Sequence, residues 1–447
     1  MSESITVTGI DHPDVARDKR GWLLAMGVLS LPFLTMILAL HGLRDVYHTF
    51  HYGDEPEFHY PVILDFMRTF PRADLTDYTS ATTPLFHLVV AWAGVFLNAS
   101  LPALRMINVV ATWLFAGVVF LMATRVLRAD YWTSVLLGLT FSLAPYVFGT
   151  SFVLLTDNLA LFFAISTLYF AFRYMDSQDK DQLMLATLFA AAAILTRQLY
   201  LWLLPTIFAA WFLGLRRGSS RNPAGIFALL SLAAVPYGLL VVLWGGPVGP
   251  QFQDMHQWNL RAFGFLASCI GLYGAPFVIA SISQWRQRFG YGPFILIVVA
   301  ATAVTLLAAP LHFIPYDPNC GGRQLPICFP TDGFLWKISL KLPTVAGTSL
   351  LFWILTPFGF ATLLCAWCTG RSSATDRFYL IPLVIYVTDA IICANNTSPY
   401  QKYFDFVALL ICMLIFFRPG HYRPVVSRLV LSGYCLLFAA YAASRFA

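Results

Sequence analysis

Apolar stretches long enough to cross a lipid bilayer recur along this chain, and no other feature constrains its fold as strongly. The 447 residues are 58% hydrophobic and 11% charged, whereas soluble domains are about 45–50% apolar and about 25% charged. Inside a bilayer every backbone polar group needs an internal partner, and an α-helix supplies those partners within one segment. The sequence therefore predicts an all-α polytopic membrane protein and excludes a soluble globular fold.

The apolar stretches divide the chain into thirteen predicted spans. The first follows basic residues and has no small-residue cleavage site behind it, so it is predicted to be an anchor and not a cleaved signal peptide. Residues 1–21 are then a cytoplasmic N-terminal tail, and residues 22–447 form one transmembrane domain. The predicted spans are 22–41, 105–124, 131–149, 158–174, 182–196, 199–215, 224–244, 262–283, 291–311, 344–368, 378–394, 401–417 and 425–443.

The basic residues orient this bundle. With thirteen spans, seventeen of the 28 Lys and Arg residues fall in cytoplasmic segments, as the positive-inside rule requires. Residues 83–98 are apolar but number only about 16, fewer than the roughly 20 that a span needs. A span there would place the later basic clusters on the external side, against the positive-inside rule. This segment is therefore predicted to lie within or on the membrane surface. Residues 42–104 and 312–343 then form long external loops.

The first external loop carries the densest polar cluster. The segment His51–Tyr60 holds three carboxylates and two imidazoles, and ionised carboxylates are costly in hydrocarbon, so it must lie at the membrane surface or in a wet cavity. Together with the polar segment Asp74–Thr83 it is interpreted as the rim of an active site. Adjacent carboxylates such as Asp54 and Glu55 can differ in pKa, which would let one act as a general base. Alternatively, they cap the helix start near Pro56 or form a solvated acidic loop.

Four further polar segments fall on the same face. Asp157 follows a threonine and would suit a helix N-cap or a ligand site. Arg197 could hold a phosphate through its donor fork, or its charge could simply reach the interface. The glycine-rich loop Gly245–Gly249, followed by His256, could approach a ligand or form a plain turn. Lys402, next to tyrosines, could bind phosphate or anchor a helix end.

The cysteines give little sign of a metal or redox site. Most lie in apolar stretches, where cysteine behaves as a small hydrophobic residue. Cys320 and Cys328 share a polar loop and could form a disulfide if that loop faces an oxidising compartment.

Several of these motifs resemble a known family. Three motifs resemble those of the GT-C class of membrane glycosyltransferases: Gly53-Asp54-Glu55 with Phe58-His59, then Thr82-Thr83-Pro84-Leu85, then Thr156-Asp157. Three others resemble motifs of the dolichyl-phosphate-glucose α-1,2-glucosyltransferase family: Thr196-Arg197-Gln198, Gly245-Gly246-Pro247-Val248-Gly249 and Gln401-Lys402-Tyr403. The resemblance extends in order over residues 45–405. It departs from the family where Ser398–Lys402 replaces an Asn-Arg-His run, and the large cytoplasmic insertions of eukaryotic members are absent.

The resemblance implies a GT-C-like fold and an activity. A hexose, expected to be glucose, would move with inversion from a polyprenyl or dolichyl phosphate to a hydroxyl on a lipid-linked oligosaccharide or other glycan. Asp54 would be the general base, with Glu55 also in the catalytic pair. The implied substrate-binding residues are His59, Thr83, Asp157, Arg197, Gln198, His256, Lys402 and Tyr403. No metal, other cofactor or nucleic acid is expected, and the site would lie on the non-cytoplasmic face of the endoplasmic reticulum membrane or a bacterial inner membrane.

Two other classes of protein remain as alternatives. A secondary transporter or lipid flippase would place charged residues near the bilayer midplane, break its helices and carry inverted repeats. Asp389 is the main acidic residue inside a predicted span. A non-catalytic membrane assembly subunit is the other alternative. The substitution Asp54→Asn separates both from a transferase, because only a transferase would fold normally and lose sugar transfer.

Overall fold

The structure is a computed structural model. It describes residues 19–44, 46, 54–215, 223–255, 261–308, 334–339, 341–345, 348–369, 377–394, 401–419 and 423–444. Residues 1–18 of the predicted N-terminal tail, most of the predicted loop 312–343, and Cys320, Cys328 and His256 lie outside the described residues, whereas residues 19–21 of that tail already belong to the first helix.

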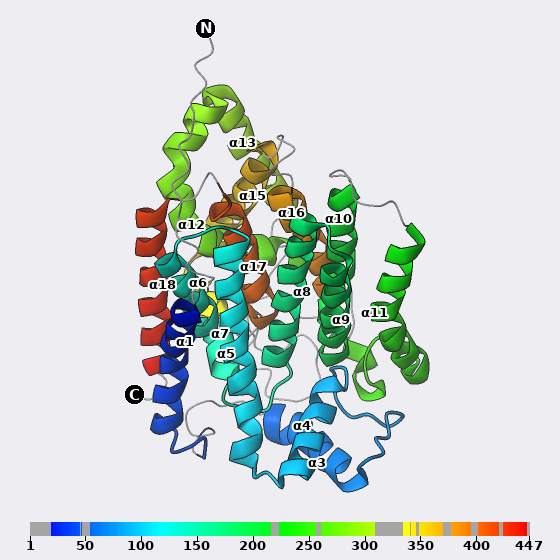
Figure 1. Cartoon of the computed structure of the whole chain (residues 1–447). Coiled ribbons are helices and arrows are strands. Elements are labelled where there is room, and N and C mark those ends of the chain that lie inside the picture. Colours follow the sequence, from blue (N-terminus) through cyan, green and yellow to red (C-terminus); the bar gives the residue numbers. More distant parts are fainter. Residues whose placement is uncertain are drawn as a thin grey trace.

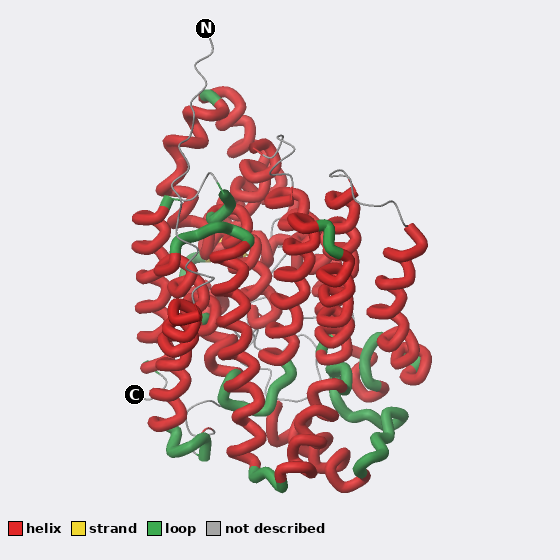
Figure 2. The backbone as a smooth tube through the Cα atoms, in the orientation of Figure 1, coloured by secondary structure: helices red, strands yellow, loops and turns green. Residues whose placement is uncertain are grey.

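Helices make up almost all of the described chain (Figures 1 and 2). The first half contains α1 (Lys19–Ala39), the π-helical turn η1 (Glu55–His59), α3 (Tyr60–Thr69), α4 (Leu85–Leu97), α5 (Leu101–Arg125), α6 (Tyr131–Leu143), α7 (Pro145–Thr150), α8 (Asp157–Ser177), α9 (Lys180–Thr196), the 3-10 turn η2 (Gln198–Trp202) and α10 (Leu203–Leu215). The second half contains α11 (Pro223–Trp244), the 3-10 turn η3 (Pro250–Met255), α12 (Arg261–Phe289), α13 (Tyr291–Ala308), α14 (Phe334–Ser339), strands β1 (Thr344–Val345) and β2 (Thr348–Ser349), α15 (Leu350–Thr369), α16 (Arg377–Ala394), α17 (Gln401–Phe416) and α18 (Pro424–Ala443).

Each of the thirteen predicted spans coincides with helical structure. Within the described residues, eight helices are long and apolar enough to cross a membrane. The remaining predicted spans contain α6 with α7, α9, α13, α15 and α17. The prediction of an all-α polytopic protein is therefore confirmed.

Two predicted spans differ in detail from the observed helices. Residues 131–149 were expected to form one helix, but the helix breaks at Ala144, whose ψ of 133° is non-helical. The cause is Pro145, because proline disfavours the helical conformation in the residue before it. The span predicted from residue 344 begins instead with an antiparallel β1–β2 pairing, Thr344 opposite Ser349, and α15 starts only at Leu350.

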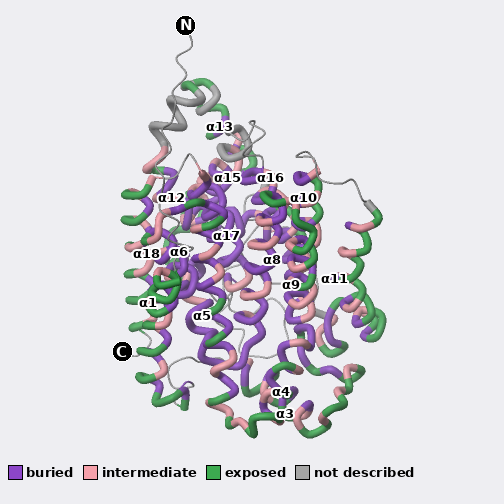
Figure 3. The backbone as a smooth tube through the Cα atoms, in the orientation of Figure 1, coloured by how far each residue is buried: buried purple, intermediate pink, exposed green. Residues whose placement is uncertain are grey.

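The helices differ in how deeply they are buried. In α8 and α12, 72% of the apolar window is buried inside the protein, against 22% in α11 and 17% in α18. Figure 3 shows the same contrast, with buried segments in the middle of the bundle and exposed ones on its flanks. The exposed apolar faces of α11 and α18 are those expected of helices that meet lipid tails.

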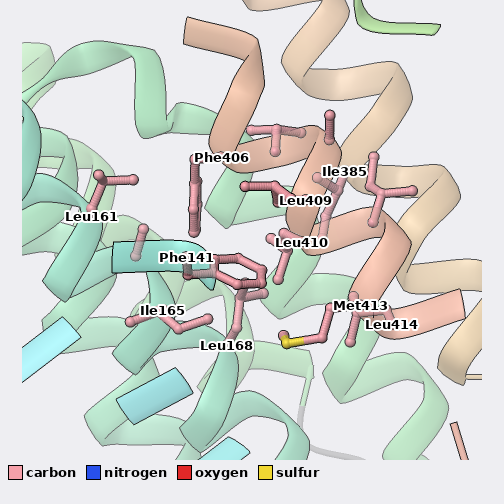
Figure 4. Packing of buried hydrophobic residues seen from close by; sticks show 14 of the residues in the cluster. Phe141, Leu161, Ile165, Leu168, Ile385, Phe406, Leu409, Leu410, Met413 and Leu414 are labelled. Atoms are coloured by element: carbon pink, nitrogen blue, oxygen red, sulfur yellow. The ribbon is translucent and has the colours of Figure 1, made fainter. Parts of the chain in front are cut away.

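Helix α17 occupies the centre of the bundle. An unbroken run of its residues, 404–415, is buried. Figure 4 shows Phe406, Leu409, Leu410 and Met413 packed among side chains of neighbouring helices. This packing fixes the N-terminal turn of α17 in place, and that turn carries Lys402 and Tyr403.

One end of the bundle is built from irregular segments. Helices α3 and α4 lie there, beyond the ends of the long helices (Figure 1). The start of α8, the end of α9 and the first turn of α17 reach the same place, because ion pairs connect them to η1 and to one another. We call this the polar end. Helix α4 is 13 residues long, which agrees with the prediction that segment 83–98 is too short to span.

Candidate functional site

Asp54 lies at the open side of the polar end. Its side chain is 49% exposed, and its Oδ2 atom is 3.5 Å from Nζ of Lys402 in the first turn of α17. Asp54 precedes η1 but makes no side-chain capping hydrogen bond. A capping role therefore does not explain this carboxylate, which is paired with a cation yet still accessible.

Asp157 and Arg197 form a second ion pair beside the first. Nη1 of Arg197 donates to Oδ1 of Asp157, and both side chains are largely buried. Thr156 precedes α8 and does not cap it through its side chain, so Asp157 is held by the arginine. The guanidinium of Arg197 also lies 4.9 Å from the ring centroid of Tyr403, and Lys402 lies 5.5 Å from the same ring. Tyr403 thus contacts both cations.

Glu55 has a different environment from its neighbour Asp54. It is completely buried, and its two oxygens accept hydrogen bonds from Nε and Nη2 of Arg105 at 2.9 and 3.0 Å. One of these oxygens also accepts from the backbone N–H of Leu154 at 3.1 Å, while Arg105 donates to the carbonyl of Leu43 at 2.6 Å. Glu55 therefore ties η1 to α5 and to the loop before α8. This geometry favours a supporting role for Glu55 over proton transfer.

His59, at the end of η1, lies behind the ion pairs and is 7% exposed. Burial lowers the pKa of its imidazole to about 4; Asp54 and Asp157 oppose this shift, whereas Arg197 and Lys402 add to it. The imidazole is therefore neutral near pH 7. All four charged groups act on this one ring, so they lie close to it.

Two other predicted residues hold the site together. Thr83 is buried and its hydroxyl donates to the carbonyl of Ile194, 2.7 Å away in α9. Nε2 of Gln198 donates to the carbonyl of Ala81 at 2.7 Å. Both bonds join the segment before α4 to the end of α9, next to Arg197. Direct binding of substrate by Thr83 and Gln198 stays a prediction.

The glycine-rich loop after α11 packs against the segment before α4. A Cβ atom on Gly249 would lie only 2.6 Å from the carbonyl oxygen of Ser80 and 2.9 Å from that of Tyr78. A glycine is therefore needed for this close approach. Trp244 stacks on Tyr78, with ring centroids 5.5 Å apart, and donates to the carbonyl of Leu75. The loop thus forms a wall of the polar end.

Sequence reasoning missed three residues of this end: Arg105, His87 and Tyr78. Arg105 stands at the start of a predicted apolar span, and an arginine there needs a partner; that signal could have identified it as the partner of a loop carboxylate. His87 is likewise a polar residue in an apolar helix. Tyr78 lies in the predicted rim segment Asp74–Thr83, but nothing in the sequence distinguishes it within that segment. Across the described residues, no three His, Cys, Asp or Glu side chains are grouped so as to hold a metal ion.

Comparisons with known proteins identify no family. No protein-family model and no curated protein matches the sequence. The fold is similar to the crystal structure of ArnT from Cupriavidus metallidurans in the apo state, with 13% sequence identity, 89% of this chain and 77% of that chain covered, and a TM-score of 0.39. A TM-score this low assigns neither fold family nor activity. What the described residues do establish is an α-helical, multi-pass integral membrane protein with ion pairs gathered at one end.

Proposed function

We propose that this chain is a membrane glycosyltransferase of the GT-C class, which moves a hexose from a polyprenyl phosphate to an acceptor hydroxyl. One observation carries the proposal: the accessible carboxylate Asp54 lies beside the cation Lys402, next to the Asp157–Arg197 pair. A transferase of this kind needs a base for the acceptor proton and positive charge for the departing phosphate. Both are present at the polar end.

Asp54 is the proposed general base. The acceptor oxygen attacks the anomeric carbon, the bond from that carbon to the phosphate oxygen breaks, and the lipid phosphate leaves with the electron pair. The acceptor proton passes to a carboxylate oxygen of Asp54. Among the three carboxylates that pair with Lys402, Arg105 and Arg197, Asp54 suits this step because Glu55 is fully buried and Asp157 is only 16% exposed in its ion pair.

Lys402 and Arg197 are the proposed phosphate ligands. Only Nη1 of Arg197 is described as bonded to Asp157, and a guanidinium carries five N–H donors, so others can reach a phosphate. Lys402 and Arg197 pair with Asp54 and Asp157, and their positive charge can also stabilise an incoming phosphate with little reorganisation of the site. The expected donor is dolichyl- or polyprenyl-phosphate glucose, and the expected product is an α-1,2-linked glucoside on a lipid-linked oligosaccharide.

A panel of donors tests the activity. Purified protein in lipid is incubated with radiolabelled polyprenyl-phosphate glucose, mannose, galactose and 4-amino-4-deoxyarabinose, with a lipid-linked oligosaccharide as acceptor. We expect the highest rate of transfer with polyprenyl-phosphate glucose as the donor. The proposal of a transferase would be excluded if none of the four donors were hydrolysed or gave transfer and if the Asp54→Asn variant behaved like the wild type.

The polar end is proposed to face away from the cytoplasm. Asp74 lies there and is exposed, so a cysteine at position 74 is an accessible probe. In a background without reactive native cysteines it should be labelled by an impermeant reagent from the external side only. Labelling from the cytoplasmic side alone would reverse the proposed topology.

A transporter remains the second candidate because of acidic residues inside the bundle. Asp389 in α16 is 2% exposed and accepts a weak bond from Cys393, 3.8 Å away. Asp405 in α17 is also buried and accepts from Gln401 at 3.0 Å. A transporter would depend on these acids for coupling to an ion. Loss of function in Asp389→Asn with an unaffected Asp54→Asn variant would favour it.

A further inference from the structure

Three side chains form a continuous hydrogen-bonded row that ends at the proposed site. The hydroxyl of Tyr78 is 2.7 Å from Nδ1 of His87, and Nε2 of His87 is 2.9 Å from Nδ1 of His59. The two imidazoles are stacked, with ring centroids 5.1 Å apart and planes inclined by 19°. All three side chains are buried. The function proposed above gives this row no role.

Each member of the row is uncharged near neutral pH. Burial lowers the pKa of His87 well below its usual value and brings that of His59 to about 4. Burial also raises the pKa of the Tyr78 hydroxyl, so it keeps its proton. A neutral imidazole carries one N–H and one acceptor nitrogen, and the row therefore fixes which nitrogen of each ring is protonated.

The chemistry of the phenol selects one of two possible directions. A tyrosine O–H is more acidic than the N–H of a neutral imidazole and is the stronger donor, and its oxygen lies 2.7 Å from Nδ1 of His87. Tyr78 then donates to Nδ1 of His87. His87 in turn carries its proton on Nε2 and donates it to Nδ1 of His59, which leaves the proton of His59 on Nε2.

The far end of the row is rigid. Trp244 stacks on Tyr78 with an interplanar angle of 5°, and Phe66 stacks on Tyr78 as well, with ring centroids 6.2 Å apart. The close contact of Gly249 with the backbone of Tyr78 and Ser80 holds this segment. The glycine-rich loop thus holds Tyr78, at the far end of the row, in place.

We propose that His59 is a binding residue whose Nε2–H donates a hydrogen bond to a hydroxyl of the transferred sugar, and that His87 and Tyr78 are positioning residues that fix its tautomer. This inference rests on the proposed function. Nδ1 of His59 is occupied by His87, so Nε2 is the nitrogen left for a ligand. Asp54, Asp157, Arg197 and Lys402 all act on this ring. The cations suit the phosphate, whereas a neutral donor suits an uncharged sugar hydroxyl.

The matched variants His87→Gln and His87→Met test the row. Glutamine can accept from Tyr78 and donate to His59, whereas methionine is of similar length and does neither. In protein labelled with ¹⁵N-histidine, the ¹⁵N shifts of His59 should report the Nε2–H tautomer at pH 7 in the wild type and in His87→Gln, and a mixture in His87→Met. This readout needs no substrate. An Nδ1–H tautomer at His59 in the wild type would overturn the proposed row.

Binding measurements test the ligand separately from turnover. The probes are polyprenyl-phosphate glucose and bare polyprenyl phosphate. His87→Met should weaken binding of the glucose-bearing lipid by about 3- to 10-fold, the value of one hydrogen bond, with the bare lipid unaffected, and His87→Gln should recover most of the loss. Equal losses for both lipids, or for both variants, would reduce the row to packing. A wild type that binds both lipids but transfers no sugar would refute the proposed activity and leave this binding role in place.

Discussion

The two ends of the helix bundle carry ion pairs of different kinds. Among the described residues of the polar end, Asp54–Lys402, Glu55–Arg105 and Asp157–Arg197 are the pairs that join separate segments of the chain. At the opposite end the pairs are Asp176–Arg377, which joins α8 to α16, and Asp130–Arg428, which joins the start of α6 to α18. The pairs at the opposite end each connect two helices and lie apart from one another. At the polar end, the charged groups of two pairs act on a single ring, His59.

This difference separates ion pairs that join two helices from charged groups that lie close together around one site. An exposed pair such as Asp130–Arg428 contributes little beyond fixing two elements, because water screens it. Charges gathered around one partly accessible space keep an electrostatic field there, and such a field is what a charged substrate or transition state needs. Substitutions of Asp54 and Arg197 should therefore impair activity, whereas substitution of the exposed Arg428 should lower stability only slightly.

The largest effect is expected from Asp54→Asn. The amide keeps the shape of the carboxylate and cannot take a proton, so kcat should fall by about 10²- to 10⁴-fold with donor binding little changed. Asp65→Asn is the matched control, because Asp65 belongs to the neighbouring helix α3 and its side chain is 47% exposed, against 49% for Asp54. Single-turnover assays measure both. Equal rates in the two variants would remove Asp54 from the chemistry.

Arg197→Lys should come next. An ammonium can still pair with Asp157, but it cannot reproduce the fork that holds a phosphate at two points. One such charged contact is worth on the order of 2–4 kcal/mol, which is about 30- to 1000-fold in rate. The control is Arg68→Lys in the exposed pair with Asp65. Normal turnover in Arg197→Lys would leave Arg197 as no more than the partner of Asp157.

Glu55→Gln should act on stability more than on chemistry. The amide keeps one acceptor but leaves the buried charge of Arg105 without its counter-ion, and breaking such a pair costs about 3–5 kcal/mol. We expect about 3 kcal/mol, seen as a lower midpoint of thermal unfolding in detergent. The folded fraction should retain most of its activity. A stable but inactive Glu55→Gln protein would instead make Glu55 the base and exchange the roles of the two carboxylates.

Much of the fold could be predicted because hydropathy and charge are one-dimensional signals. The length of an apolar stretch predicts a helix directly, and each predicted span contains helical structure. The break at Ala144 was also visible in principle, since Pro145 follows it. The pairing of β1 with β2 was not, because a two-residue strand has no periodicity to detect.

The candidate site was predictable only in part. Asp54, Asp157, Arg197 and Lys402 stood out because charge is rare in this chain and all four fall on one predicted face. The separate environments of Asp54 and Glu55 could not be foreseen, since they depend on Arg105, which is 50 residues further along. The row from Tyr78 to His59 likewise depends on how α4 packs, and a single sequence carries no record of that packing.

The smallest effect is expected at the opposite end, from Arg428→Gln. The side chain of Arg428 is 44% exposed, and a surface pair of this kind is worth about 0.2–1 kcal/mol. Asp130 keeps other partners when the arginine is lost, because it accepts from the backbone N–H and the hydroxyl of Thr133 at the start of α6. The unfolding midpoint should therefore fall by a degree or so, and turnover should stay within about twofold of the wild type. A loss of more than tenfold in rate, in protein that remains folded, would show that the opposite end also takes part in function and would end the contrast between the two.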